Sequence, residues 1–248
     1  MLKKERHAYI IQQINIHNKV LSSDLCVQLD VSEDTIRRDL QELAEEGKLI
    51  KVHGGALAKS FHFTIESKQV YSLDEKKIIA QKAIDLIKDG MLVVISGGTT
   101  MRELVNLLPP DLNVTFVTAN LPIALELLEH PQAEVIFLGN KLLKSAQMAV
   151  GAAVVQKLGQ LKADLCLLGT NSIDISFGIS DLELEIIEVK RAMIACAQKT
   201  VSLAISEKLN SVQRLQVCPL EEVDILITEL DPADEKLIPY ALKGLTIL

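Results

Sequence analysis

The sequence lacks the features that mark membrane, secreted and metal-binding proteins. Its longest apolar runs, such as residues 91–95, are far shorter than the ~20 residues of a membrane-spanning helix. No uninterrupted apolar segment follows the charged N-terminus, so a cytoplasmic protein without a membrane partner is expected. The four cysteines form no C-x-x-C pair and have no histidine at ligand spacing. We therefore expect no metal site and no disulfide bonds, and interpret Cys26, Cys166, Cys196 and Cys218 as buried thiols.

Motifs for nucleotide cofactors are missing as well. The glycine-rich segment at residues 96–100 has neither the G-x-G-x-x-G spacing of dinucleotide-binding folds nor the G-K-[ST] ending of a P-loop. No cofactor is therefore expected. With 248 residues, of which 48% are hydrophobic and 24% charged, the chain has an ordinary globular composition and is long enough for two domains.

Residues 32–47 have the pattern of a helix whose two ends are both marked. Ser32 is a good N-cap, and Glu33 and Asp34 place negative charge in the first turn, where the helix dipole favours it. Gly47 can adopt the left-handed conformation that ends many helices. A helix is therefore predicted to begin at Glu33 and to end before Gly47.

This helix is predicted to be a DNA-recognition helix. Ile36, Leu40 and Leu43 recur at spacings of four and three and form one buried stripe, which leaves Arg37 and Arg38 facing outward. The guanidinium group of arginine can bind two phosphate oxygens or the O6 and N7 atoms of guanine. The residues alone do not decide between these two roles, and a solvated surface pair is the alternative.

The flanking segments complete a winged helix-turn-helix. Ile10, Ile11, Ile14 and Ile16 predict a first helix, and Leu25, Val27 and Leu29 predict a shorter second one. After the recognition helix, residues 49–52 and the turn at residues 53–56 predict a two-stranded wing. The recognition helix would enter the major groove of double-stranded operator DNA, and the wing would lie along the backbone. The predicted DNA contacts are Ser32, Thr35, Arg37, Arg38, Gln41, Lys48, Lys51 and His53.

The distribution of charge supports DNA binding although the net charge is −7. Residues 1–59 carry nine basic and nine acidic side chains, so the acidic excess belongs entirely to the rest of the chain. Lys48, Lys51, His53 and Lys59 gather on the predicted wing, where phosphate contacts would be needed.

The rest of the chain is predicted to be a doubly wound, mainly parallel α/β domain. Residues 1–59 form the DNA-binding domain, polar residues 60–75 are the predicted connector, and residues 76–248 are the α/β domain. In the last part, short apolar runs typical of strands buried on both faces alternate with helical patterns. The runs are 91–95, 114–117, 135–138, 165–168, 201–205 and 223–227, and the main helical patterns are 75–88, 101–108, 122–128, 152–158, 183–197 and 234–242.

A ligand site is predicted at the carboxyl ends of these strands. The turn Ser96-Gly97-Gly98-Thr99-Thr100 joins a strand to a helix, so backbone N–H groups and Thr hydroxyls can surround a phosphate or carboxylate. Further polar turns follow other strands at residues 118–120, 139–141 and 169–171. A cation over the site can come from Lys208, with Lys190 or Arg191 as alternatives. The predicted effector contacts are Gly97, Gly98, Thr99, Thr100, Asn120 and Lys208.

Over essentially its full length the sequence resembles the DeoR-type transcriptional regulators. The N-terminal match is VSEDTIRRDLQELAEEGKLIKVHGGA, residues 31–56. In the second domain the match runs through G-G-T-T at 97–100, T-A-N at 118–120, D-x-x-x-x-G at 164–169, E-V-K-R-A-M at 188–193 and Lys208. The resemblance implies a winged helix-turn-helix joined to a sensor domain similar to ribose-phosphate isomerases. Such a domain binds a sugar phosphate or related metabolite and thereby alters operator affinity.

Three positions depart from that family's pattern. Ser96 stands where the family commonly has Asp, Asn140 stands where it often has Gly, and Ile205 begins I-S-E-K where it has D-x-S-K. Carboxylates in such a pocket accept hydrogen bonds from sugar hydroxyls. Their loss favours a different or less hydroxylated effector, or weakened sensing.

Three functions are compatible with the sequence. The first is a non-enzymatic repressor that senses a small, phosphorylated metabolite and forms a homodimer or homotetramer, because paired half-sites need paired recognition helices. The second is a sugar-phosphate isomerase-like enzyme with an accessory DNA-binding domain, its base coming from Glu183, Glu185 or Glu188. The third is a repressor that responds to no effector.

Overall fold

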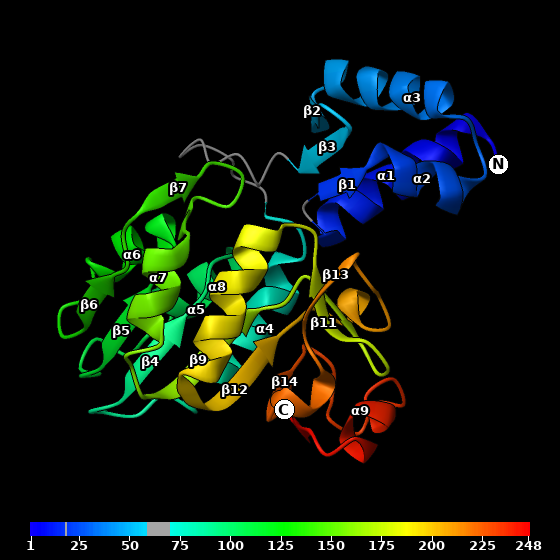
Figure 1. The fold of residues 1–248 in the computed structure, drawn as a ribbon. Helices are drawn as coiled ribbons and strands as arrows, with labels where there is room; N and C mark the ends of the chain where they lie inside the picture. The colour runs from blue at the N-terminus through cyan, green and yellow to red at the C-terminus, as the bar shows by residue number, and fades with distance from the viewer. Residues whose placement is uncertain (18, 59–69) are drawn as a thin grey trace. The chain divides into compact units, whose positions relative to one another are not determined.

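The computed structural model describes residues 1–17, 19–58 and 70–248, which form two compact units (Figure 1). Unit 1 spans Met1–Tyr71 and unit 2 spans Ser72–Leu248. Most of the predicted connector, and Lys59, lie outside the described residues. Helix α4 begins at Leu73, inside the segment predicted as connector. Among the described residues, no helix is long and apolar enough to cross a membrane.

Unit 1 has the predicted order of three helices. They are α1 (Lys3–His17), α2 (Ser22–Leu29) and α3 (Glu33–Glu45). Helix α3 begins at the predicted residue because the Ser32 side chain caps it, accepting a hydrogen bond from the backbone N–H of Thr35 at 3.3 Å. Gly47 adopts the left-handed conformation with φ of 68°, as predicted. Ile36, Leu40 and Leu43 are all buried, whereas Val27 of α2 is 83% exposed and does not belong to the core as the sequence suggested.

The wing is larger than the predicted two-stranded hairpin. Strands β2 (Leu49–Val52) and β3 (Gly55–Ala58) form the hairpin, and β1 (Lys19–Leu21) pairs antiparallel with β3. The sequence did not predict β1, because a segment of three residues between two helices is too short to show the alternating pattern of a strand. A Cβ atom on Gly55 would lie 2.0 Å from the carbonyl oxygen of Val20. Glycine is therefore required for the close approach of β1 to β3.

A buried carboxylate joins α1 to α3. Asp39 is 2% exposed and accepts hydrogen bonds from Arg6 Nε at 2.7 Å and Arg6 Nη2 at 3.0 Å. His7 Nε2 lies 3.1 Å from the same carboxylate. Burial alone would raise the pKa of Asp39, but the hydrogen bonds from Arg6 and His7 outweigh burial and lower it. The ion pair thus fixes the recognition helix against the first helix.

Unit 2 is built on a seven-stranded sheet in the order β15-β14-β12-β9-β4-β5-β6. Every pairing in this sheet is parallel, which confirms the predicted sheet type. The six predicted apolar runs correspond to six of its strands. The strands are β4 (Leu92–Ile95), β5 (Thr115–Thr118), β6 (Glu134–Phe137), β9 (Ala163–Gly169), β12 (Ala197–Leu203), β14 (Ile225–Ile227) and β15 (Thr246–Ile247).

Helices cover both faces of this sheet, as a doubly wound fold requires (Figure 1). Helices α7 and α8 pack together on one face, and α4, α5 and α6 lie on the other. The helices are α4 (Leu73–Ile84), α5 (Thr99–Asn106), α6 (Leu121–Leu127), α7 (Ala152–Leu158), α8 (Leu184–Ala195) and α9 (Ile238–Leu242). Helix α9 is shorter than the predicted 234–242.

Two small antiparallel sheets, which the sequence analysis did not predict, flank the main one. One is the β7–β8 hairpin, and the other has the order β10-β11-β13. Their strands are β7 (Lys141–Leu143), β8 (Met148–Val150), β10 (Ser172–Asp174), β11 (Gly178–Asp181) and β13 (Leu215–Cys218). Strands of three or four residues carry too few alternating positions to be detected from the sequence.

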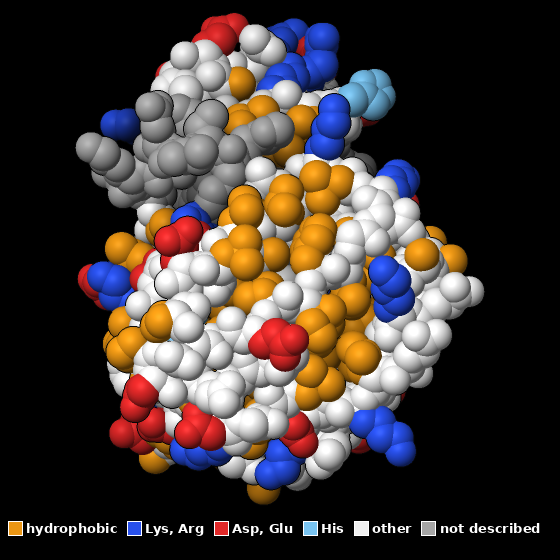
Figure 2. All heavy atoms as spheres, turned by 90° about the vertical axis from the view of Figure 1, so that its left-hand side faces the viewer, with side chains coloured by type: hydrophobic (Ala, Val, Ile, Leu, Met, Phe, Trp, Pro, Cys, Tyr) orange, Lys and Arg blue, Asp and Glu red, His pale blue; other side chains and the backbone are white. Residues whose placement is uncertain are grey.

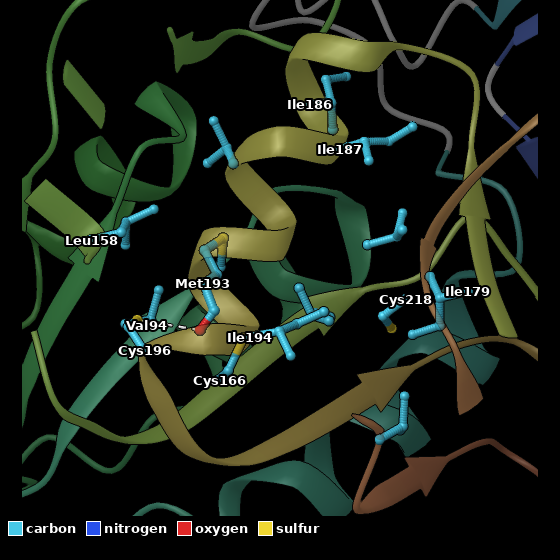
Figure 3. Packing of buried hydrophobic residues seen from close by; sticks show 14 of the residues in the cluster. Val94, Leu158, Cys166, Ile179, Ile186, Ile187, Met193, Ile194, Cys196 and Cys218 are labelled. Atoms are coloured by element: carbon cyan, nitrogen blue, oxygen red, sulfur yellow. Dashed lines mark hydrogen bonds between the residues drawn. The ribbon is translucent and has the colours of Figure 1, made fainter. Parts of the chain in front are cut away.

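Part of the hydrophobic core of unit 2 lies between α8 and the central strands (Figure 3). Met193 and Ile194 of α8 lie beside Val94 of β4 and Cys166 of β9. Burial raises the pKa of Cys166 and Cys196, and it raises that of Cys218 to about 12, so these thiols stay protonated. These three cysteines are buried as predicted, whereas Cys26 in unit 1 is only half-buried.

Replacement of Asp39 by asparagine is expected to destabilise unit 1 by about 3 kcal/mol at neutral pH, because it leaves Arg6 without its charged partner. The folded-state pKa of Asp39 is below its ordinary value of 3.8, so its ionised form favours folding. This contribution is complete above that value and is lost as the pH falls through the lowered pKa. Urea unfolding at several pH values should show wild type approaching Asp39→Asn in acid; a constant difference between them would contradict the assignment.

Candidate functional sites

The outward face of α3 presents two arginines that share one carboxylate. The side chains of Arg37 and Arg38 are 69% and 75% exposed. Arg37 Nη2 lies 2.7 Å from Asp34 Oδ1, and Arg38 Nη2 lies 2.6 Å from Asp34 Oδ2. The hydrogen bond from Arg37 and the charge of Arg38 lower the pKa of Asp34. Both guanidinium groups are therefore accessible to an external anion, which must compete with Asp34.

The wing contributes a further cation to the same surface. Lys51 of β2 donates through Nζ to Gln41 Oε1 at 3.0 Å and to the carbonyl oxygen of Arg37 at 3.3 Å. Gln41 in turn donates to Glu45 Oε1 at 2.8 Å. These bonds join α3 to β2, so residues fourteen positions apart in the sequence act on one surface.

The other predicted DNA contacts lie at the ends of this surface. Ser32 Oγ and Thr35 Oγ1 are 2.9 Å apart at the start of α3, which gives Ser32 a structural role as well. Lys48, in the turn before β2, lies 2.7 Å from Glu46 Oε2, and His53 is exposed in the β2–β3 turn. All eight predicted contacts thus come from α3, its N-cap and the β2 segment with its flanking turns.

In unit 2 the strand order reverses between β4 and β9. The chain runs outward from β4 to β5 and β6, and then returns to β9 on the opposite side of β4. Ligands of open α/β sheets bind outside the carboxyl ends of the strands at such a reversal. The segments at this point are Ser96–Thr100 after β4 and Gly169–Asn171 after β9.

Close backbone packing brings these segments together with Asn120. A Cβ atom on Gly97 would lie 2.3 Å from Asn120 Nδ2, and one on Gly169 would lie 2.6 Å from the carbonyl oxygen of Gly97. Asn120 caps α6 by accepting from the N–H of Ile123 at 3.2 Å, and it donates to Ala146 O at 3.0 Å. Gly97 and Asn120 therefore have structural roles in positioning the site.

Gly98 and the two threonines form the start of α5. Gly98 is its N-cap with a φ of 117°, and a Cβ atom there would meet nothing within 4 Å. The first intrahelical hydrogen bond runs from the N–H of Arg102 to Gly98 O at 3.1 Å, so the preceding N–H groups of the first turn have no intrahelical acceptor. Thr99 is half-buried and Thr100 is 8% exposed. This geometry offers donors to an anion.

Lys208 lies at the same strand ends, as predicted. It ends the 3-10 turn Ser206–Lys208 after β12 and donates through Nζ to the carbonyl oxygen of Thr170 at 2.8 Å. Burial, together with the positive charges of Lys76 and Lys190, lowers the pKa of Lys208 to about 7. The surroundings of Lys208 therefore disfavour its charged form, and a bound anion would stabilise that form.

Three more charged groups lie around Lys208, two of which the sequence analysis missed. Lys190 of α8 donates to Asp181 Oδ2 at 2.8 Å in a buried contact and to Gly169 O at 3.1 Å in a partly buried one. Burial lowers the pKa of Lys76 in α4 to about 8. Asp181 and Lys76 were missed because neither belongs to a strand-end loop after the main strands. The charges of Glu75, Glu103 and Glu207 partly offset this effect at Lys76, and Asp181 forms an ion pair with Lys190.

Of the three positions that depart from the family pattern, Ser96 and Ile205 are buried and Asn140 is exposed. Ser96 is 3% exposed, and its Oγ accepts the backbone N–H of Gly169 at 2.7 Å. Ile205 is 2% exposed. Asn140 lies beyond the edge strand β6, where its Oδ1 accepts the N–H of Lys141 at 2.7 Å. Ser96 thus joins β4 to β9 across the reversal.

The carboxylates considered as catalytic bases make other contacts. Glu183 Oε2 accepts from Ser145 Oγ at 2.9 Å, and Glu185 Oε1 lies 2.9 Å from Lys141 Nζ. Glu188 is exposed on α8. Two of the three therefore contact the β7–β8 region, beside the sheet edge formed by β6.

Comparison with known proteins identifies both units. Residues 6–61 match the DeoR-like helix-turn-helix domain, and residues 72–230 match the DeoR C terminal sensor domain. The HTH-type transcriptional repressor GlcR of Bacillus subtilis (strain 168) is 33% identical over 238 residues, covering 94% of this chain and 90% of that protein. The glycerol-3-phosphate regulon repressor of Haemophilus influenzae is 31% identical over 231 residues, covering 92% and 90%.

Among solved structures, ribose 5 phosphate isomerase A from Neisseria gonorrhoeae resembles part of unit 2 only distantly. It is 14% identical with a TM-score of 0.40, covering 54% of this chain and 52% of its own, a likeness too low to bear on function. The domain matches span both units, and the relatives cover nearly the whole chain. The chain belongs to the DeoR family of transcriptional regulators.

Proposed function

We propose that this protein is an operator-binding repressor whose sensor domain binds a small phosphorylated metabolite between α5 and Lys208. The observation that carries the proposal is the half-buried Lys208, which lies at the reversal between β4 and β9 beside the open N-terminus of α5. A phosphate group matches both parts, since it is an anion that accepts several hydrogen bonds.

On the DNA side, α3 enters the major groove, with Thr35, Arg37 and Arg38 at base edges or phosphates. Gln41 and Lys51 extend the surface toward the wing, while Lys48 and His53 approach the backbone. Ser32 serves mainly as the N-cap that orients the first turn. On binding, phosphate oxygens or guanine acceptors replace Asp34 as partners of the two arginines.

On the effector side, the N–H groups around Gly98 and the hydroxyls of Thr99 and Thr100 receive the phosphate, and Lys208 supplies charge. Gly97 and Asn120 support this arrangement through packing. The buried Ser96 and Ile205 leave few acceptors for sugar hydroxyls, which favours a small, sparsely hydroxylated phosphate ester. The glycerol-3-phosphate regulon repressor among the relatives is named for such a compound.

Regulation then follows from linkage. An effector that binds the DNA-competent and DNA-incompetent arrangements with different affinity shifts the balance between them by that difference alone. We propose a homodimer or homotetramer, because paired half-sites need paired recognition helices. The relatives are named regulators, which supports a function without catalysis.

Arg37→Ala and Arg38→Ala should each weaken operator binding, because each removes a guanidinium group from the outward face of α3. The loss should be about 1–3 kcal/mol, with relaxed specificity at one base pair, for an arginine that binds guanine. Fluorescence anisotropy with labelled operator measures the loss. Arg214→Ala removes the same charge from unit 2 and is the control. Unchanged binding by both α3 variants would exclude this recognition surface.

Thr100→Ala should reduce the response of operator binding to effector while leaving operator affinity without effector unchanged. The substitution removes a hydroxyl at the start of α5 without altering unit 1. Thermal-shift screening with glycerol 3-phosphate and other sugar and polyol phosphates identifies the effector, and anisotropy then measures the response. Thr246→Ala, at an exposed position in β15, is the matched control. If no phosphate ester stabilises the wild type, the effector-independent repressor is the better description.

Anion binding by the sensor domain should weaken as the pH rises through about 7, the pKa of Lys208, because the lysine loses its charge there. Sulfate is the probe of choice since its own charge is constant over this range, and calorimetry measures its affinity. Lys208→Met should bind sulfate weakly and without this pH dependence. A wild-type affinity that is constant across neutral pH would show that Lys208 does not face the anion.

A further inference from the structure

The two edges of the seven-stranded sheet are protected very differently. At one edge, β15 is only two residues long, and a short strand offers little to pair with. At the other edge, β6 presents Glu-Val-Ile-Phe, and among the described residues no strand pairs with its outer side. Lysine, proline and bulges, which commonly protect sheet edges, are absent from these four residues.

The backbone groups of β6 point alternately toward β5 and toward the outer side. Glu134 N–H donates to Val114 O at 3.0 Å, and Leu138 N–H donates to Thr118 O at 2.8 Å. Even-numbered residues of β6 therefore bond to β5, and the N–H and C=O groups of Val135 and Phe137 point away from it. The Phe137 C=O group also accepts a hydrogen bond from the N–H of Gly139 at 3.2 Å. Because a carbonyl oxygen has two lone pairs, all four groups can still pair with another strand.

Apolar side chains surround this edge (Figure 2). Ile136 and Phe137 of β6 are 38% and 39% exposed, Leu142 of β7 is 44% exposed, and Leu125 and Leu128 at α6 are 56% and 66% exposed. Figure 2, which views the side of unit 2 where β6, β7 and α6 lie, shows hydrophobic side chains gathered over the middle of the face. Contiguous exposed apolar surface of this kind marks protein interfaces.

We propose that a second copy of this chain pairs with β6, antiparallel, across a two-fold axis at Ile136. Val135 of one subunit then exchanges both backbone hydrogen bonds with Phe137 of the partner subunit, and two seven-stranded sheets become one. The inference rests on the proposed homo-oligomer and names the surface that forms it.

A second copy fits this edge better than an unrelated partner for two reasons. The outward groups at Val135 and Phe137 lie symmetrically about Ile136, so the strand is complementary to itself. In that register Glu134 faces Leu138 of the partner subunit, and no like charges lie directly opposite each other. The outward-facing apolar side chains around β6 meet their own copies, as an isologous interface requires.

The first test places a charge on the axis. Ile136→Lys should halve the mass of the assembly in sedimentation velocity, because two lysines would face each other and block strand pairing. Leu242→Lys, at an 83% exposed position in α9, is the control and should leave the mass unchanged. Circular dichroism verifies that both variants are folded. A monomeric wild type would refute the proposed oligomer, whereas an oligomeric wild type with an oligomeric Ile136→Lys would refute only this surface.

The second test does not depend on destabilisation. Residues paired across the axis at Ile136 would be a non-hydrogen-bonded pair, with Cα atoms about 4.5 Å apart, which is within disulfide range. In a Cys26→Ser background, which removes the half-buried thiol, Ile136→Cys should form a covalent dimer on mild oxidation. Leu242→Cys should not. Absence of the covalent dimer from an oligomeric Ile136→Cys variant would exclude this register.

Discussion

The reversal of strand order between β4 and β9 is the constraint on which the sensor domain depends. The segments that follow β4 and β9 leave the ends of these adjacent strands in opposite directions. The hydrogen bond from the N–H of Gly169 to Ser96 Oγ connects the two segments. Lys190 and Lys208 then donate to the carbonyl oxygens of Gly169 and Thr170. One short backbone segment thus holds both lysines, so the proposed effector site depends directly on the order of the strands.

In unit 1, a buried ion pair fixes the orientation of helix α3. Asp39 lies on the inner side of α3, so its bonds to Arg6 and His7 fix the rotation of the helix about its own axis. That rotation decides which side chains face outward. The interior carboxylate and the exterior arginines are therefore parts of one arrangement, although Asp39 would never touch DNA.

Local patterns in the sequence predicted the recognition helix well, because Ser32, Gly47 and the stripe from Ile36 to Leu43 act within a few residues of one another. The apolar runs predicted six strands of the main sheet for the same reason. Contacts between distant segments could not be predicted this way. Strand β1 forms only because Gly55 admits it, and Lys76 and Asp181 join Lys208 only through the sheet order. The roles of individual site residues also depend on such contacts between distant segments, so local sequence patterns predict these roles less directly than they predict helices and strands.

The pairing of Arg37 and Arg38 with Asp34 has a consequence for how DNA is searched. The free protein already contains an anion at the tip of its recognition surface, so any stretch of phosphate backbone competes with an intramolecular partner that is never diluted away. A nonspecific contact therefore gains little binding free energy, because the two arginines exchange the Asp34 carboxylate for a phosphate. In the proposed DNA complex, the Asp34 carboxylate is thus an internal competitor that every contact of these two arginines with DNA must displace.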